Sequence, residues 1–397
     1  MSRYYFIEKH FNWEEGSVKE IEKLDAGFLI HLQFHASASC CPYCHSHKLH
    51  IKDYRNQKIL LGHWDFSPIF ALVHKRRYVC TSCHKTFYES IPDIDRYQRR
   101  SNTLINKILY TCSKMMSFKT VAELNGVSVS TVIRYFDRIT VQRPLHLPSI
   151  LSLDEFRGNA HGQRYQVAVN NPQTHEILDI LPKRTAAEII RYFSQYSREE
   201  RMKVKFVVMD LSLLFRKVVR TIFPCAVIIG DRFHIQRLVL WALERVRKNV
   251  QNLFQEKRIY FKRNKHILNK KGAALTEEEL VCLHEILKQS PQLQRAYALK
   301  EAFFKVFSMK DPASVQAFLS RWLQLVEESG VEEFKRVLKT FKTWETEIQE
   351  GLTHVYSNGF TEGMNNKIKV LKRTAFGFRN FSRFRARILW LFRVKQQ

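Results

Sequence analysis

Three acidic residues that are far apart in the sequence, Asp154, Asp210 and Glu362, stand where folding could bring them to one metal site. Asp154 ends the apolar run SILSLD, and Asp210 ends the later apolar run KFVVMD. Carboxylate oxygens are hard ligands that suit Mg²⁺ or Mn²⁺. Two such ions about 4 Å apart can activate water or a 3′-hydroxyl and stabilise the leaving oxygen during in-line attack on a phosphodiester. The three acids therefore predict phosphoryl-transfer chemistry that depends on two divalent ions.

The elements around these acids must position them. Apolar runs predict strands, and amphipathic stretches predict helices; the strands are expected at 149–154, 164–170, 175–181, 205–210 and 226–231, and the helices at 185–196 and 213–223. In an RNase H-like mixed sheet, this order places Asp154 and Asp210 at adjacent strand ends. Glu362 follows the turn-forming Ser357-Asn358-Gly359 at the start of a helix-like stretch, from which it can supply the third carboxylate.

Each acid taken singly has a simpler interpretation. An aspartate after a strand is often only a helix N-cap, and Glu362 could be a first-turn charge favoured by the helix dipole. Asp231 also ends an apolar run and could replace Asp210, but counting strands favours Asp210, because Asp231 falls on the fifth strand rather than the fourth. Asp231 and His234 are then accessory residues that orient a ligand or contact the scissile phosphate; otherwise they are a helix cap and a core histidine.

Two C-x-x-C pairs predict a structural Zn²⁺ site. Cys41 and Cys44 form the first pair, and Cys80 and Cys83 form the second. Two tight turns that each carry two thiolates can close a tetrahedral site and staple a small β domain, which we expect over residues 1–98. Neighbouring residues could replace a ligand: Cys40, His45, His47 and His84. The basic residues Lys75, Arg76 and Arg77 of this domain could contact DNA.

A helix-turn-helix is predicted within residues 99–146. Ala122 is small enough for two helices to cross, Gly126 suits the turn, and Ser128 can cap the second helix. That helix is expected to direct three side chains outward to DNA, in addition to Ser128: Ser130, Thr131 and Arg134. A helical hairpin that serves only packing would give the same pattern.

The composition indicates a polyanionic partner. A formal net charge of +27 and a pI near 9.8 favour nucleic acid. No run of about 18 apolar residues occurs, and the charged N-terminus does not resemble a signal peptide. We therefore expect a cytoplasmic, nucleoid-associated protein whose thiols stay reduced and that does not associate with membranes.

The segment after Glu362 is basic and aromatic. It contains no Asp or Glu, and five of its cations are expected to grip phosphates: Lys367, Lys369, Lys372, Arg373 and Arg379. The alternative is a solvated helix face, with Phe384 and Trp390 in the core. Residues 238–352 are helical in pattern. A core role is favoured for Trp241, Trp322 and Trp344, and the alternative is that they contact DNA ends or a second subunit.

Four segments together resemble the signature blocks of DDE transposases from bacterial insertion sequences, most of all the ISL-three branch. They are LSLDEF (151–156), VVMD (207–210), GDRFHIQRL (230–238) and the block from Ser357 to Leu389. The resemblance covers essentially the whole chain. It implies a DDE triad at Asp154, Asp210 and Glu362, and a helical insertion between the fifth strand and the helix that carries Glu362.

The expected fold is multidomain α+β and α/β. We predict a zinc ribbon (1–98), a helix-turn-helix (99–146), an RNase H-like core in two parts (147–237 and 353–397) and the helical insertion (238–352) between those parts. The expected function is DNA transposition: binding of terminal inverted repeats in double-stranded DNA, cleavage, and strand transfer to target DNA. Processing two ends predicts a homodimer or larger assembly. The alternatives are a non-catalytic zinc-ribbon and helix-turn-helix transcriptional regulator, and a nuclease or resolvase that cuts without joining.

Overall fold

The computed structural model describes residues 2–35, 38–160, 162–254, 256 and 258–393. The chain forms two compact units. The first contains the residues up to 141, 370–377 and those from 386 onward; the second contains 142–369 and 378–385. The last two helices therefore contribute residues to both units.

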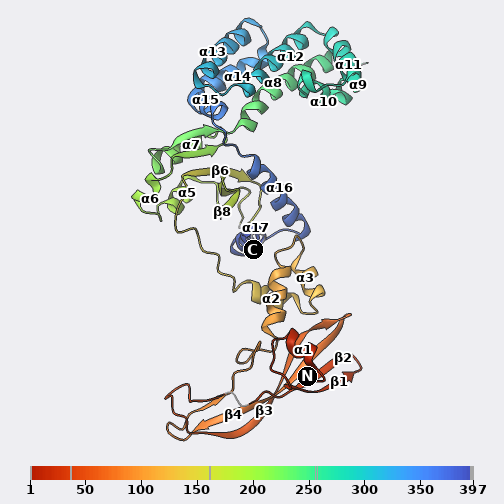
Figure 1. The fold of residues 1–397 in the computed structure, drawn as a ribbon. Helices are drawn as coiled ribbons and strands as arrows, with labels where there is room; N and C mark the ends of the chain where they lie inside the picture. Colours follow the sequence, from red (N-terminus) through yellow and green to blue (C-terminus); the bar gives the residue numbers. More distant parts are fainter. Residues whose placement is uncertain (1, 36–37, 161, 255, 257, 394–397) are drawn as a thin grey trace. The chain divides into compact units, whose positions relative to one another are not determined.

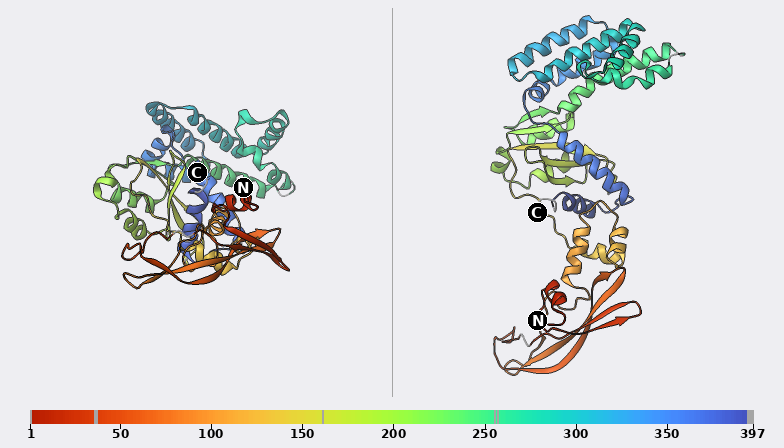
Figure 2. Two further views of the ribbon diagram at one scale, coloured as in Figure 1. Left: turned by 60° about the horizontal axis from the view of Figure 1, so that its bottom comes forward. Right: turned by 45° about the vertical axis from the view of Figure 1, so that its right-hand side comes forward.

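The first unit begins with a short helix and a sheet built around a long hairpin, which is the red and orange hairpin of Figures 1 and 2. The sheet order is β1-β2-β4-β3, with β5 added to β4 and β2 parallel to β4. Alternate residues of β4 point into the core, including Ala71 and Val73, as half-buried strands require. The elements are α1 (Tyr5–His10), β1 (Val18–Leu24), β2 (Gly27–Leu32), β3 (Leu49–Trp64), β4 (Ser67–Cys80) and β5 (Thr86–Tyr88).

Three helices follow in the same unit: α2 (Asn102–Thr111), α3 (Phe118–Leu124) and α4 (Val129–Phe136). Each begins after a serine whose side chain accepts a hydrogen bond from the third backbone N–H of the helix, and these serines are Ser101, Ser117 and Ser128. Gly126 has a φ of 56° in the turn between α3 and α4, a conformation that favours glycine. The observed helices match the predicted helix-turn-helix.

The second unit contains a five-stranded mixed sheet of order β10-β9-β6-β7-β8. Strands β6, β7 and β8 are antiparallel neighbours, and β9 and β10 run parallel to β6. This is the sheet predicted for the RNase H-like core, and every strand lies within two residues of its predicted bounds. The strands are β6 (Ile150–Phe156), β7 (Gln166–Asn171), β8 (Glu176–Leu181), β9 (Phe206–Met209) and β10 (Val227–Gly230).

Helices α5 (Ala186–Phe193), α6 (Arg198–Met202) and α7 (Leu213–Ile222) belong to the same core. Phe193 of α5 and Phe215 of α7 are fully buried among the apolar residues of the sheet. The continuous apolar strands noted in the sequence are therefore explained by burial of the sheet beneath helices.

A block of helices, green to blue in Figures 1 and 2, separates β10 from the last two helices. Its core contains Trp322 and Trp344, as predicted, whereas Trp241 is 50% exposed, contrary to the prediction. The helices are α8 (Arg232–Leu253), α9 (Arg258–Arg263), α10 (Lys265–Asn269), α11 (Glu277–Lys288), α12 (Pro291–Phe304), α13 (Pro312–Glu328), α14 (Glu332–Thr343) and α15 (Glu345–Thr353), with 3₁₀ turns at Gly272–Ala274 and Lys305–Ser308. Among the described residues, no helix is long and apolar enough to cross a membrane.

The chain then forms α16 (Gly359–Thr374) and α17 (Phe381–Arg393). In the second unit, the first half of α16 lies along the sheet beside β6 (Figure 1), and hydrogen bonds of Thr361 and Asn365 join this helix, which carries the exposed Glu362, to β6. In the first unit, Trp390 and Arg387 of α17 support the helix-turn-helix: Trp390 donates from Nε1 to the carbonyl of Leu109, and Arg387 donates to the carbonyls of Lys114 and Met116.

Candidate active site and metal centres

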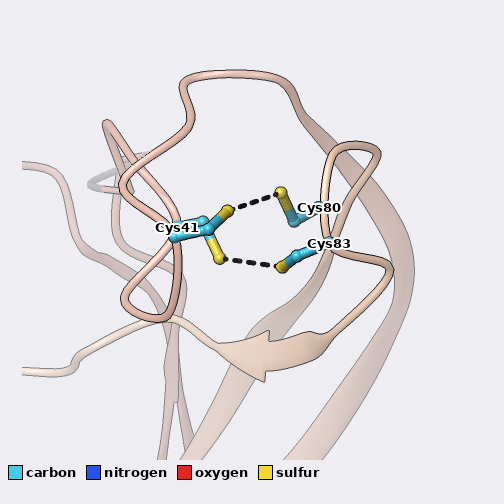
Figure 3. A group of neighbouring side chains, drawn as sticks. Cys41, Cys80 and Cys83 are labelled. Carbon is cyan, nitrogen blue, oxygen red and sulfur yellow. Dashed lines mark hydrogen bonds between the residues drawn. The ribbon is translucent and has the colours of Figure 1, made fainter.

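The four cysteines of the two C-x-x-C pairs meet at one point of the first unit. Their sulfur atoms all lie within 4.8 Å of one another. Cys41 Sγ lies 3.7 Å from Cys83 Sγ, and Cys44 Sγ lies 3.6 Å from Cys80 Sγ; Figure 3 shows the sulfurs facing one another across two turns. Four sulfurs bound to zinc at about 2.3 Å in a tetrahedron would be about 3.8 Å apart, so the observed spacing fits Zn²⁺.

The thiols of this cluster differ in their pKa values. The backbone N–H of Cys83, and after it that of Ser82, lower the pKa of Cys80 to about 6 despite burial, whereas, against the backbone N–H of Ser46, the thiol of Cys83 raises the pKa of Cys44 to about 12. The neighbouring side chains considered as alternative ligands are not part of the cluster, and His47 instead makes a hydrogen bond with the carbonyl of Ser39. The donor set is thus the four cysteines.

Three aspartates form a row at one edge of the sheet in the second unit. Leu153 of β6 is paired with Met209 of β9, and Met209 is paired with Gly230 of β10. Asp154 follows Leu153, Asp210 follows Met209 and Asp231 follows Gly230, so the three aspartates are neighbours across the strands. Because neighbouring strands lie about 4.8 Å apart, these carboxyl groups crowd together.

The crowding is visible in their pKa values. Burial, and then the negative charges of Asp210 and Asp231, raise the pKa of Asp154 to about 6, although the backbone N–H of Glu155 opposes the shift. Burial also raises the pKa of Asp210, against the nearby positive charges of His234 and Arg184. A divalent cation bound beside these acids would favour their ionised forms and lower their pKa values.

Asp210 and Asp231 differ in how their oxygens are occupied. Asp231 is buried and accepts from the backbone N–H of Asn358 at 3.3 Å, and it also bonds to His234 Nδ1 at 2.8 Å. Asp210 Oδ1 is buried without a hydrogen-bond partner among the described residues. A cation would satisfy this oxygen, whereas the oxygens of Asp231 already have partners.

His234 is held beside the acids by its bond to Asp231. Burial alone would lower the pKa of His234, but the hydrogen bond and charge of Asp231, with the charges of Asp210 and Asp154, raise it. His234 thus lies beside three carboxyl groups, and their charges favour the protonated form of its imidazole.

Helix α16 is fixed to the sheet by buried polar side chains rather than by apolar packing alone. Ser152 of β6 donates to Asn358 Oδ1 at 2.6 Å and lies 3.3 Å from the hydroxyl of Thr361. Asn170 of β7 donates to Thr361 Oγ1 at 3.1 Å. Asn365 then donates to Asp154 Oδ2 at 2.8 Å. This ladder sets the register of α16 against the strands.

The register determines where Glu362 lies. Residues three apart on a helix have Cβ atoms about 5–6 Å apart, so Glu362 stands one turn from Asn365, which touches Asp154. Glu362 is exposed on this helix. Within the described part of the chain, Asp154, Asp210 and Glu362 do not form a set whose oxygens all lie within 4.8 Å of one another.

Both oxygens of Asp154 accept hydrogen bonds, Oδ1 from the backbone N–H of Glu155 and Oδ2 from Asn365. A site for two ions about 4 Å apart spreads its ligands more widely than a site for one ion.

The structure corrects three expectations about DNA contacts in the first unit. Thr131 is 3% exposed, and its hydroxyl bonds to that of Ser128, because it packs on the inner face of α4. Arg76 is half-buried, with a side chain 11% exposed that is paired with Glu89 at 2.8 Å, and Lys75 is buried and donates to Gln57. In contrast, the structure leaves other predicted contacts accessible: Ser128, Ser130 and Arg134 are exposed, and Arg77 is half-buried.

The basic C-terminal segment divides into two kinds of cation. Arg385 and Arg387 are structural: Arg385 bonds Asp179 through two nitrogens, and Arg387 is 1% exposed beneath α3 and α4. Phe384 is fully buried and Trp390 half-buried. The cations predicted to grip DNA are more accessible: Lys367, Lys369, Arg373 and Arg379 are exposed, and Lys372 is half-buried.

Sequence reasoning missed the buried polar ladder. Asn358, Thr361 and Asn365 recur at spacings of three and four residues, which places them on one helix face. That spacing was the available signal, but polar residues at helical spacing normally indicate a solvated face. Only the sheet, with Ser152 and Asn170 opposite, shows that this face is buried.

Comparison with known proteins agrees with this architecture. A profile described as a transposase, the DDE domain of the ISL3 group, matches residues 151–388. The chain belongs to the ISL3 family of transposases. The helix-turn-helix domain of the same family matches residues 89–140, and the zinc finger of the transposases of IS204, IS1001, IS1096 and IS1165 matches residues 37–83.

Individual relatives include two transposases. The chain is 25% identical over 329 residues to the transposase for insertion sequence element IS1001 of Bordetella parapertussis, covering 79% of this chain and 80% of that protein. It is 26% identical over 257 residues to the transposase for IS1557 of Mycobacterium tuberculosis, covering 58% and 57%. A Lactococcus lactis protein named an ATP-dependent protease is 36% identical over 135 residues, covering 34% of this chain and 39% of that protein. The sequence of this ISL3 transposase contains no GxxxxGK[ST] nucleotide-binding loop.

Proposed function

We propose that this protein binds the terminal inverted repeats of its insertion sequence, cuts DNA strands at the element ends and joins them to target DNA. Asp154, Asp210 and Glu362 are its catalytic residues. The observation that carries the proposal is the row of aspartates at the sheet edge, with the polar ladder that holds the Glu362 helix beside it. The family membership supports the general activity, and this cluster supports its assignment to the sheet edge.

The donor set fits Mg²⁺ or Mn²⁺. Asp154, Asp210 and Glu362 would hold two such ions, because they offer only oxygen ligands and Asp210 Oδ1 has no hydrogen-bond partner among the residues that the structure describes. When bound, the ions supply activation of water or a 3′-hydroxyl and stabilisation of the leaving oxygen.

The chain's own residues perform the remaining tasks. Asn365 orients the carboxylate of Asp154, and Asp231 holds the imidazole of His234 at the sheet edge where a phosphate would lie. Ser130 and Arg134 of α4 would contact base edges and phosphates of the terminal repeat. The four cysteines would hold Zn²⁺ as a structural ion. The substrate would place the protein in the cytoplasm with the nucleoid.

The test is a strand-cleavage and strand-transfer assay with labelled duplexes made from the DNA that flanks the reading frame. We expect products only with Mg²⁺ or Mn²⁺. Glu362→Gln should abolish cleavage while leaving duplex binding nearly unchanged. Glu345→Gln, which changes an exposed glutamate at the start of α15, is the matched control and should remain active. Cleavage by Glu362→Gln would remove Glu362 from the mechanism, and binding without any metal-dependent cutting would support a transcriptional regulator.

Two ends must be processed together, so we propose that the active form is at least a dimer. Light scattering on the protein with an excess of end duplex should give the mass of two or more chains. A single chain per productive complex would contradict this.

A further inference from the structure

Helix α8 carries an exposed row of two aromatic rings with a guanidinium between them, which we call the α8 ladder. It consists of Phe233, Arg237 and Trp241, four residues apart. The guanidinium of Arg237 lies 5.2 Å from the ring centroid of Phe233 and 4.3 Å from that of Trp241. Phe233 is 41% exposed and Trp241 is 50% exposed.

The α8 ladder is not needed to hold the helix in place. The opposite face of α8 supplies the core, through fully buried residues such as Val239, Ala242 and Leu243. Within the described residues, Arg237 makes no ion pair with an acidic group, in contrast to Arg247 on the same helix, which is paired with Glu244. Exposed aromatic rings beside a cation that has no carboxylate partner among the described residues indicate a ligand-binding surface.

The α8 ladder is continuous with the candidate active site. Helix α8 begins directly after Asp231, and His234 and Trp241 are seven residues apart, which places them on one face about 10 Å apart along the helix axis. The whole α8 ladder spans about 12 Å along the helix axis. A strand whose phosphate lies at the acids would therefore pass along this row.

The chemistry of the α8 ladder selects the ligand. Aromatic rings stack on nucleobases of any sequence, and a guanidinium binds phosphate or stacks on the same rings. Bases in a duplex are already stacked, so only an unpaired base can lie against Trp241. A protein partner fits less well, because a second copy of this chain brings 65 basic but only 38 acidic residues to a surface that already carries a cation.

We propose that the α8 ladder holds the unpaired nucleotides next to the scissile phosphate, with a base stacked on Trp241 and a phosphate bound by Arg237. This inference rests on the proposed function and adds to it: the end of the element must open locally during cleavage, and these are positioning residues that hold the open strand.

The first experiment measures binding of single-stranded oligothymidine to the full-length zinc-loaded protein without added Mg²⁺ or Mn²⁺. Stacking on Trp241 should quench tryptophan emission on binding. Trp241→Phe should lose most of this quench, whereas Trp64→Phe, which removes a tryptophan that is 68% exposed on β3, should keep it. Quenching that survives in Trp241→Phe, or that disappears in Trp64→Phe instead, would overturn the proposal.

Affinity provides a second readout. Trp241→Ala should weaken oligothymidine binding roughly 5- to 150-fold, while Trp241→Phe should keep most of it, since a phenyl ring still stacks. Arg237→Gln should reduce the slope of log K against log salt by about 0.7, as expected for one lost phosphate contact with a single strand. Unchanged affinity in Trp241→Ala with an unchanged melting temperature would refute the α8 ladder.

A cleavage assay with paired and pre-opened substrates distinguishes a failure of this inference from a failure of the proposed function. On a fully paired end duplex, Trp241→Ala should lower kcat about tenfold or more, and a substrate whose terminal nucleotides are already unpaired should restore most of the rate. Equal loss on both substrates would refute the role of the α8 ladder while leaving the transposase proposal intact. If the wild-type protein binds and is quenched by oligothymidine but cuts no duplex, the proposed reaction fails and the base-stacking surface remains.

Discussion

The buried carboxyl of Asp154 should destabilise the folded protein when no divalent cation is bound. Its pKa rises from 3.8 to about 6 on folding. Because the folded-state pKa lies above the unfolded value, the folded protein holds this proton more tightly than the unfolded chain does. The resulting stabilisation is complete below about pH 4 and is lost as the pH rises through about 6. A difference of about two pKa units corresponds to about 3 kcal/mol at pH 7.5.

Asp154→Asn should therefore stabilise the metal-free protein at pH 7.5. An asparagine removes the ionisation cost of about 3 kcal/mol but gives up one of the two hydrogen bonds from Glu155 and Asn365, worth about 1 kcal/mol. The net gain of about 2 kcal/mol should raise the melting temperature of the catalytic unit by about 4–8 °C. At pH 5 the gain should shrink, because Asp154 is then largely protonated in the folded wild type.

Differential scanning calorimetry without added Mg²⁺ or Mn²⁺, with the zinc retained, measures these shifts. The transition of the catalytic unit is the one that Mn²⁺ moves upward in the wild type, and Mn²⁺ should move it much less in Asp154→Asn. Asp179→Asn is the matched control: Asp179 is also buried but accepts two hydrogen bonds from Arg385, so its neutralisation should lower the melting temperature at both pH values. No gain for Asp154→Asn at pH 7.5, or an equal gain at pH 5, would refute the electrostatic argument.

Three further outcomes are expected. Cys80→Ser should reduce the zinc content measured by atomic absorption to well below one ion per chain and abolish duplex binding; full zinc occupancy would contradict the four-cysteine site. Asn365→Ala should lower metal-dependent cleavage about 10- to 100-fold with duplex binding unchanged, because Asp154 loses its orienting donor. A wild-type rate would show that the hydrogen bond from Asn365 to Asp154 is dispensable. At limiting Mn²⁺, cleavage should rise between about pH 5 and 7 as Asp154 gives up its proton, and saturating Mn²⁺ should shift the midpoint downward; a midpoint independent of Mn²⁺ would exclude Asp154 as the titrating ligand.

The sequence predicted the sheet well because its strands are buried on both faces. Continuous apolar runs such as FVVM and VIIG are distinctive. An aspartate directly after such a run lies at a strand end regardless of the conformation of the following loop. The two C-x-x-C pairs were equally informative, since their turns fix the positions of the sulfurs.

Side-chain direction was less predictable. Thr131 and Arg76 are polar residues at plausible DNA-facing positions, yet Thr131 packs inward and Arg76 forms an ion pair with Glu89. Trp241 shows the opposite error: a large apolar ring favours burial, but the core of the helical block was already filled from the other face of α8. Sequence periodicity gives the faces of a helix but not which face meets a neighbour.

The attachment of α17 to the helix-turn-helix has a consequence for the order in which the protein becomes competent during synthesis. Arg387 and Trp390 donate hydrogen bonds to backbone carbonyls of α2 and of the loop before α3. No earlier part of the described chain supplies these bonds. A ribosome adding about 5–20 residues per second needs roughly 12–50 s to travel from α4 to α17. During that interval the nascent helices lack their final support, so stable capture of an element end must wait until Glu362 has also been made.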